Sequence, residues 1–239
     1  MSNAVQEFSR FAHEYDSYNV IQAEVAKTLV NMIPVSHHTT VLDIGCGRGE
    51  VYKNIVTSDL AFENFIALDS SLPMLTLHPS AHTIRKIHAD FNTSDAFSTL
   101  SSDDNSLILS SSALQWSKDL DFTLGQMAQK SPAAYFAIFT ANTFKTLHQS
   151  AGISSPIYSG STLRDTIEKY YTASFEIKEY RLSFESIREM FHYIKKSGVS
   201  GGEKHLSYKQ TKELMMQYPL DYLEFEVLFV KGNSLVYAV

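Results

Sequence analysis

Short apolar runs alternate, along the first 140 residues, with longer stretches in which apolar residues recur at every third or fourth position. The short runs are rich in Val, Ile, Leu and Phe, which predicts buried β-strands, and the helical spacing predicts α-helices between them. Strands that alternate with helices favour a parallel sheet. The predicted strands are 40–44, 64–69, 83–88, 106–110 and 133–140, and the predicted helices are 4–33, 49–57, one with Pro73 near its start, and one from Asp119 or Asp121 to about 130.

The last third of the chain has a different pattern. Helical spacing returns at 161–171, 184–196 and 208–218, and two β-prone stretches lie at 175–182 and 222–230. We therefore expect a Rossmann-like α/β fold, with a seven-stranded, mostly parallel sheet and helices on both faces. The helices between the last two strands form an insert, which we expect over the strand ends, where ligands bind in open α/β sheets.

A glycine-rich turn follows the first predicted strand. Residues 41–49 read VLDIGCGRG, in which Asp43 lies at the end of the strand and every second residue from Gly45 to Gly49 is glycine. Glycine lets a backbone approach a ligand closely, because it has no Cβ and adopts positive φ at little cost. A strand, a glycine turn and a helix in this order are typical of nucleotide-binding folds.

Two further carboxylates end the next two predicted strands. Asp69 lies roughly 20 residues beyond the glycine turn, where such folds place an acid against ribose hydroxyls. Asp90 follows the third strand in the same way. The glycine after Gly47 is Gly49, which departs from the GxGxxG spacing and argues against NAD.

Three successive strands that each end in Asp resemble the class I S-adenosylmethionine-dependent methyltransferases. The resemblance implies S-adenosylmethionine as the cofactor, with the glycine turn under its methionine part. It further implies that Asp69 binds the ribose hydroxyls and that Asp90 meets the adenine amino group. The cofactor-binding residues that it implies are Arg10, Asp43, Gly45, Cys46, Gly47, Asp69, Ser70, Met74, Asp90, Phe91, Ser110 and Ser111.

Motifs along nearly the whole chain narrow this resemblance. They are residues 8–16 (FSRFAHEYD), 110–116 (SSSALQW), 147–149 (LHQ), 194–200 (IKKSGVS) and 218–220 (YPL). In this order and at these spacings they resemble the malonyl-acyl-carrier-protein O-methyltransferases of biotin synthesis. Ser111 departs from that family, which often has Asn there, and it offers a hydroxyl in place of an amide.

The resemblance implies methyl transfer to the free carboxyl of a malonyl thioester on acyl carrier protein, in the cytoplasm, by a protein that we expect to be a monomer. We expect a single domain over residues 1–239. Its predicted parts are an N-terminal helical cover (1–33), a cofactor-binding core (34–142), helices and a substrate lid around one strand (143–218), and a C-terminal strand (219–239).

Four residues are candidates for the catalytic site. Tyr15 would cover the cofactor, against the alternative of a partly buried Tyr on an ordinary amphipathic helix. Trp116 would line the acyl channel or serve as a rim or core aromatic. Arg181 and Lys196 are the preferred pair to grip the malonyl carboxylate, against the alternative that they are exposed surface charges.

Composition excludes several classes of function. The net charge of −6 gives no global electrostatic case for nucleic-acid binding. The single cysteine, Cys46, allows no intrachain disulfide, and the histidines lack metal-ligand spacing, so we expect no metal. The sequence has no apolar run long enough to span a membrane and no signal-peptide pattern at its start, so we expect no membrane association.

Three other functions stay open at this point. One is methylation of a free small carboxylic acid, of the trans-aconitate kind, in the same pocket. Another is a non-catalytic binding protein that keeps the fold. A nucleic-acid methyltransferase is disfavoured, because the chain is acidic and has no Asn/Asp-Pro-Pro-Tyr/Phe sequence to stack a flipped base.

Overall fold

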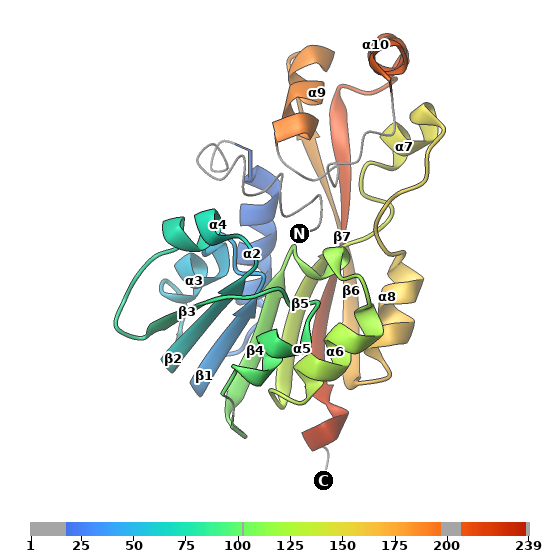
Figure 1. Ribbon diagram of the computed structural model, residues 1–239. Coiled ribbons are helices and arrows are strands. Elements are labelled where there is room, and N and C mark those ends of the chain that lie inside the picture. The colour runs from blue at the N-terminus through green and yellow to red at the C-terminus, as the bar shows by residue number, and fades with distance from the viewer. Residues whose placement is uncertain (1–17, 102, 197–206, 238–239) are drawn as a thin grey trace.

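The computed structural model describes residues 18–101, 103–196 and 207–237, without the side chains of residues 195, 196 and 208. Its strands form one seven-stranded sheet in the order β3-β2-β1-β4-β5-β7-β6 (Figure 1). Strands β1 to β5 are parallel, and β7 runs antiparallel to both of its neighbours. The predicted seven-stranded, mostly parallel sheet is confirmed. The strands are β1 (Ser36–Ile44), β2 (Leu60–Asp69), β3 (Ile84–His88), β4 (Ser106–Ser111), β5 (Ala133–Phe139), β6 (Tyr171–Ser183) and β7 (Tyr222–Ser234).

Helices cover both faces of the sheet (Figure 1). Side chains alternate between the two faces along each strand, so Val41 packs with α2 on one face while Leu42 and Ile44 pack with α5, α6 and α8 on the other. Each face therefore has its own apolar core. The α-helices are α2 (Val20–Asn31), α3 (Glu50–Ile55), α4 (Leu72–Leu77), α5 (Ser94–Ser98), α6 (Leu120–Ala128), α7 (Lys145–Ala151), α8 (Gly160–Ile167), α9 (Ile187–Lys196) and α10 (Tyr208–Gln217).

The boundary between α8 and β6 differs from the prediction. The helix ends at Ile167 and the strand already begins at Tyr171, four residues before the predicted extended stretch. Tyr171 is fully buried and pairs with Ser234 at the far end of β7. Long-range pairing to β7 therefore overrides the local helical spacing. Of the predicted helix 4–33, residues 20–31 form α2, and residues 4–17 lie outside the described residues.

Strands β6 and β7 continue beyond the rest of the sheet as a two-stranded ribbon. β7 pairs with β5 only over Val227–Asn233, whereas residues 222–226 pair with residues 179–183 of β6 alone. This ribbon carries α9 and α10 between its strands, and Figure 1 shows both helices with α7 at one end of the molecule. The predicted helical insert between the last two strands is confirmed. We call residues 187–196 and 207–217 the α9–α10 insert.

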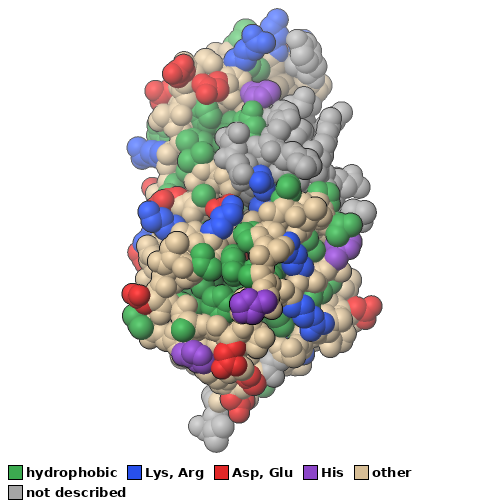
Figure 2. Space-filling view, turned by 90° about the vertical axis from the view of Figure 1, so that its left-hand side faces the viewer, with side chains coloured by type: hydrophobic (Ala, Val, Ile, Leu, Met, Phe, Trp, Pro, Cys, Tyr) green, Lys and Arg blue, Asp and Glu red, His purple; other side chains and the backbone are tan. Residues whose placement is uncertain are grey.

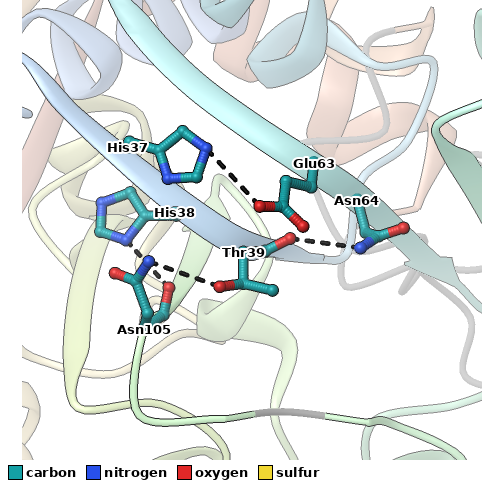
Figure 3. Close-up of polar contacts among 6 residues, drawn as sticks. All are labelled: His37, His38, Thr39, Glu63, Asn64 and Asn105. Carbon is teal, nitrogen blue, oxygen red and sulfur yellow. Dashed lines mark hydrogen bonds and ion pairs between the residues drawn. The ribbon is translucent and has the colours of Figure 1, made fainter.

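Polar contacts join β1 to its neighbours near its amino end (Figure 3). His37 Nε2 lies 3.8 Å from Glu63 Oε1, and Asn64 Nδ2 donates to the Thr39 carbonyl at 3.3 Å. Asn105, in the turn before β4, donates from Nδ2 to Thr39 Oγ1 at 3.4 Å. These exposed contacts supplement the parallel backbone pairing of β1 with β2 and β4, which brings the carboxyl ends of the three strands to a common edge.

Candidate functional site

A cleft opens where the loops after β1, β2, β3 and β4 meet. The order β3-β2-β1-β4 makes β1 and β4 the point at which chain connections diverge, and open α/β sheets bind ligands in that crevice. The cleft holds about 900 Å³ of empty space, part of it open to solvent. Its described lining comprises Gln22, Ala26, Gly45, Cys46, Gly47, Arg48, Glu50, Val51, Asp69, Ser70, Ser71, Met74, Asp90, Phe91, Asn92, Ser111, Ser112, Ala113 and Trp116.

Three glycines with positive φ shape the loop after β1. A Cβ on Gly45 would collide with the Cβ of Ala113, and a Cβ on Gly49 would lie 2.8 Å from His78 Nε2. Gly47 (φ +53°) differs, because a Cβ there would meet nothing within 4 Å in the described part of the chain. Two glycines thus allow the loop to pack against the protein, and Gly47 leaves its open side free for a ligand.

Asp69, at the carboxyl end of β2, fastens this loop to the next one. Its Oδ2 accepts a hydrogen bond from the Gly47 N–H at 2.8 Å, and its Oδ1 accepts one from the Ser71 N–H at 2.7 Å. Burial raises the pKa of Asp69, and these backbone hydrogen bonds act in the opposite direction. One carboxylate therefore holds two loops in place while it lines the cleft.

Asp90 follows β3 and is held by Asn92. The Asn92 backbone N–H and side-chain amide both donate to Asp90 Oδ1, at 3.0 and 2.7 Å. Asn92 Oδ1 in turn accepts from the Lys118 N–H at 2.7 Å. Met74 and Phe91 are buried and supply apolar walls to the same cleft. Apolar surface with a few fixed polar groups is the usual composition of a small-molecule site.

Asp43 and Ser110 lie behind the cleft, outside its lining residues. Ser110 is buried and donates to the Ile44 carbonyl at 2.7 Å, which joins β4 to β1. Asp43 is 0% exposed, and neither of its oxygens has a hydrogen-bond partner among the described residues. Burial, together with the nearby charge of Asp69, raises the pKa of Asp43 to about 8.

Nine of the predicted cofactor-binding residues line the cleft together, whereas the two predicted catalytic residues whose side chains the structure describes, Trp116 and Arg181, line different clefts. Trp116 lines the cleft, but Arg181 lies in β6, with its guanidinium 5.0 Å from the centre of the Tyr222 ring. It lines a second cleft with Lys145 and Glu224. Lys196 ends α9 and its side chain is not described. Arg10 and Tyr15 lie outside the described residues. The nine are Gly45, Cys46, Gly47, Asp69, Ser70, Met74, Asp90, Phe91 and Ser111.

Sequence reasoning missed several lining residues, of which Gln22 is the clearest. It is buried on the apolar face of α2, next to Ile21 and facing the same way as Val25 and Ala26. Its Oε1 has no hydrogen-bond partner among the described residues. The sequence pattern could have indicated Gln22, because it places this polar residue on the otherwise apolar face of the helix. The others are Ala26, Arg48, Glu50, Val51, Ser71, Asn92, Ser112 and Ala113.

Comparison of the whole chain with known proteins finds relatives of one class of enzyme. No protein-family model matches the chain. Six curated relatives are malonyl-acyl-carrier-protein O-methyltransferases. The one from Marinomonas sp. is 26% identical, over 95% of this chain and 93% of the relative. The one from Acetivibrio thermocellus is 25% identical, over 88% of this chain and 83% of the relative.

Solved methyltransferase structures share the fold. The putative methyltransferase in complex with the Trm112 activator of Haloferax volcanii superposes with a TM-score of 0.62 at 15% identity, over 95% of this chain and 97% of that one. The YcgJ protein of Bacillus subtilis gives 0.63 at 12% identity, over 88% and 98%. The chain is a class I S-adenosylmethionine-dependent methyltransferase.

The cleft of this methyltransferase fits S-adenosylmethionine. Three carboxylates (Glu50, Asp69 and Asp90) and one cation (Arg48) are the charged residues in its described lining, which favours a positively charged ligand. Gly47 leaves open space beside the loop. Within the described residues, no group of three or more His, Cys, Asp or Glu is placed to hold a metal ion, and no helix is long and apolar enough to cross a membrane.

Proposed function

We propose that this methyltransferase esterifies the free carboxyl group of a malonyl thioester carried by an acyl carrier protein. The observation that carries the proposal is the similarity to six relatives that share this one activity, which extends over 82% to 96% of the chain. The cleft is compatible with it, because the cofactor loops occupy one side and leave the β4 side for an acyl group.

In this proposal the loops after β1, β2 and β3 hold the cofactor. The backbone at Gly45–Gly49 would pass under its methionine part, Asp69 would accept from the ribose hydroxyls, and Asp90 would accept from the adenine amino group. Met74 and Phe91 would pack against the purine. Bound there, S-adenosylmethionine supplies an electrophilic methyl group on a positively charged sulfur.

The chemical step needs positioning more than acid–base catalysis. A carboxyl group is already ionised at neutral pH, so no residue has to remove a proton. The bound cofactor would supply the methyl group to the carboxylate oxygen and would leave as a neutral thioether that keeps the electron pair of the broken sulfur–carbon bond. The work of this chain is to hold the oxygen in line with the methyl group, and correct placement alone accounts for large rate accelerations.

Cations on the ribbon and the insert would meet the carrier protein. Arg181, Arg188, Lys209 and Lys212 are exposed there. Arg181 lies in the second cleft, which favours contact with the carrier or its prosthetic arm over a grip on the malonyl carboxylate. Lys and Arg side chains are scattered on the described part of the face in Figure 2, so any charge attraction would be local.

The direct test is methyl transfer from labelled S-adenosylmethionine to malonyl-loaded carrier protein. We expect the label on the acyl group. Cleavage of the thioester should therefore release the label from the carrier protein, and saponification of the methyl ester should then remove it from the acyl group. Acetyl-loaded carrier protein, which lacks the carboxyl, is the matched control and should gain none. Label on free malonate or trans-aconitate in preference to the loaded carrier would replace the proposal with that of a small-acid methyltransferase.

A further inference from the structure

Three consecutive serines at the carboxyl end of β4 differ in how their hydroxyls are used. Ser110 donates to the Ile44 carbonyl behind the cleft. Ser111 and Ser112 line the cleft, their hydroxyl oxygens are buried, and neither hydroxyl has a hydrogen-bond partner among the described residues. Leaving a buried polar group without a partner is costly, so two adjacent ones on residues that line the same cleft indicate a ligand that completes them.

Ser112 also has an unusual backbone. Its φ is +59°, in the left-handed region that non-glycine residues seldom occupy. The conformation is held from two sides, since the Ser112 N–H donates to the Ala137 carbonyl at 2.8 Å and Gln115 Nε2 donates to the Ser112 carbonyl at 2.7 Å. It brings Ala113 against the bare side of Gly45. Glycine would make this turn with less strain, so the serine brings a hydroxyl to the cleft at a cost in backbone energy.

The position of this turn indicates which ligand it faces. The residues that would hold the cofactor follow β1, β2 and β3, and β4 lies on the opposite side of β1. An acyl group that approaches the methyl donor from the β4 side therefore meets Ser111, Ser112 and Trp116. Arg48 is the only Lys or Arg in the described lining, and it belongs to the glycine loop. Among the described lining residues, the donors that the β4 side offers to an anion are therefore uncharged.

We propose that the hydroxyls of Ser112 and of Ser111, which the family resemblance gave to the cofactor, instead donate hydrogen bonds to the carboxylate of the acceptor substrate and hold it toward the methyl donor. This assignment rests on the proposed carboxyl methylation. Neutral donors orient the anion while leaving more charge on the attacking oxygen than a bidentate guanidinium would. Carboxylic acids are thereby selected over their amides and esters, which carry no charge to attract the two donors.

The test uses Ser111→Ala, Ser112→Gly and Ser112→Asn, with Ser98→Ala as the control at an exposed serine outside the cleft. The substrate is whichever carboxylic acid the unmodified enzyme methylates, loaded carrier or free acid. We expect kcat/KM for that acid to fall about tenfold or more in Ser111→Ala and in Ser112→Gly, as for loss of a hydrogen bond to a charged group. Ser112→Asn, which tolerates left-handed backbone and keeps an N–H donor, should recover part of the loss.

Two readouts separate this role from a structural or cofactor role. Calorimetric affinity for S-adenosylhomocysteine should change less than threefold in every variant, and the melting temperature of Ser112→Gly should be unchanged or higher. Equal losses of S-adenosylhomocysteine affinity and activity would overturn the proposal in favour of cofactor binding. Unchanged kcat/KM in both Ser111→Ala and Ser112→Gly would overturn it outright.

The same variants test the serine assignment separately from the proposal that the substrate is malonyl-loaded carrier protein. If only a free acid is methylated, the carrier-protein function fails while the serine assignment is tested on that acid. If the unmodified enzyme methylates no carboxylic acid, both fail together.

Discussion

The cofactor cleft and the β6–β7 ribbon with its α9–α10 insert are built on different principles. In the cleft, each loop is fixed by backbone groups: Asp69 accepts from Gly47 and Ser71, and Asp90 accepts from Asn92. In the ribbon, β6 and β7 pair with each other alone over residues 179–183 and 222–226, and the exposed side chains are mainly charged. The protein's own groups hold the cleft loops in place, whereas the ribbon exposes the side chains that we propose for contact with a carrier protein.

This difference shows that cofactor binding and protein-partner binding constrain the sequence to different degrees. A small cofactor needs atoms held within tenths of an ångström, and that demand selects particular residues at strand ends. A protein partner needs a complementary surface, which many arrangements of exposed charge provide. The following variants test the contrast, from the largest expected effect to the smallest.

Gly47→Ala should nearly abolish cofactor binding while leaving the protein folded. Its added methyl meets no atom of the described residues within 4 Å, so it would occupy space that we assign to the ligand. We expect S-adenosylhomocysteine affinity to fall at least a hundredfold and stability to fall by about 1–2 kcal/mol from left-handed strain.

Gly152→Ala is the matched control for that substitution. Gly152 (φ +65°) is the C-cap of α7, and a Cβ there also meets no described atom within 4 Å. It should show a similar loss of stability with unchanged affinity. Equal affinities in the two variants, measured by calorimetry, would show that the open side of Gly47 does not face the cofactor.

Asp43→Asn should change how stability depends on pH. The pKa of Asp43 is raised from 3.8 to about 8, so the folded protein holds a proton there that the unfolded chain loses at lower pH. Between these values unfolding releases that proton, and the stability of the unmodified protein falls as pH rises, by up to about 1.4 kcal/mol per pH unit from this group. Asn has no such proton.

Urea unfolding of both proteins from pH 5 to pH 8 measures that effect. The stability of the Asn variant relative to the unmodified protein should increase by a few kcal/mol, about 1.4 for each pH unit, over that interval. Parallel stability curves would mean that Asp43 is ionised in the folded protein and has a partner that this account omits.

Sequence alone predicted which strand ends carry the carboxylates better than it predicted where β6 begins, and particular residues show why. Asp69 and Asp90 were recognisable because parallel strands bring their carboxyl ends to one edge of the sheet. The β6 start at Tyr171 was missed because it depends on pairing with Ser234, which local spacing does not report. Gln22 and Ser112 were missed because a polar residue type predicts an exposed side chain when the three-dimensional surroundings are unknown.

Arg188→Glu should have the smallest effect of the series. Arg188 is exposed on α9, away from the cleft lining. We expect a several-fold rise in KM for malonyl-loaded carrier protein, diminishing as salt is added, because screened surface charges act weakly. S-adenosylhomocysteine affinity should not change. A fall in that affinity would mean that the insert and the cofactor cleft act as one unit.

The most direct test of the central claim is calorimetric titration of S-adenosylhomocysteine into the unmodified protein and into Asp69→Ala and Asp90→Ala. The account predicts one site per chain in the unmodified protein and an affinity at least tenfold weaker in each variant, with the larger loss for Asp69→Ala, because Asp69 also fixes Gly47 and Ser71. Affinities equal to that of the unmodified protein in both variants would contradict it.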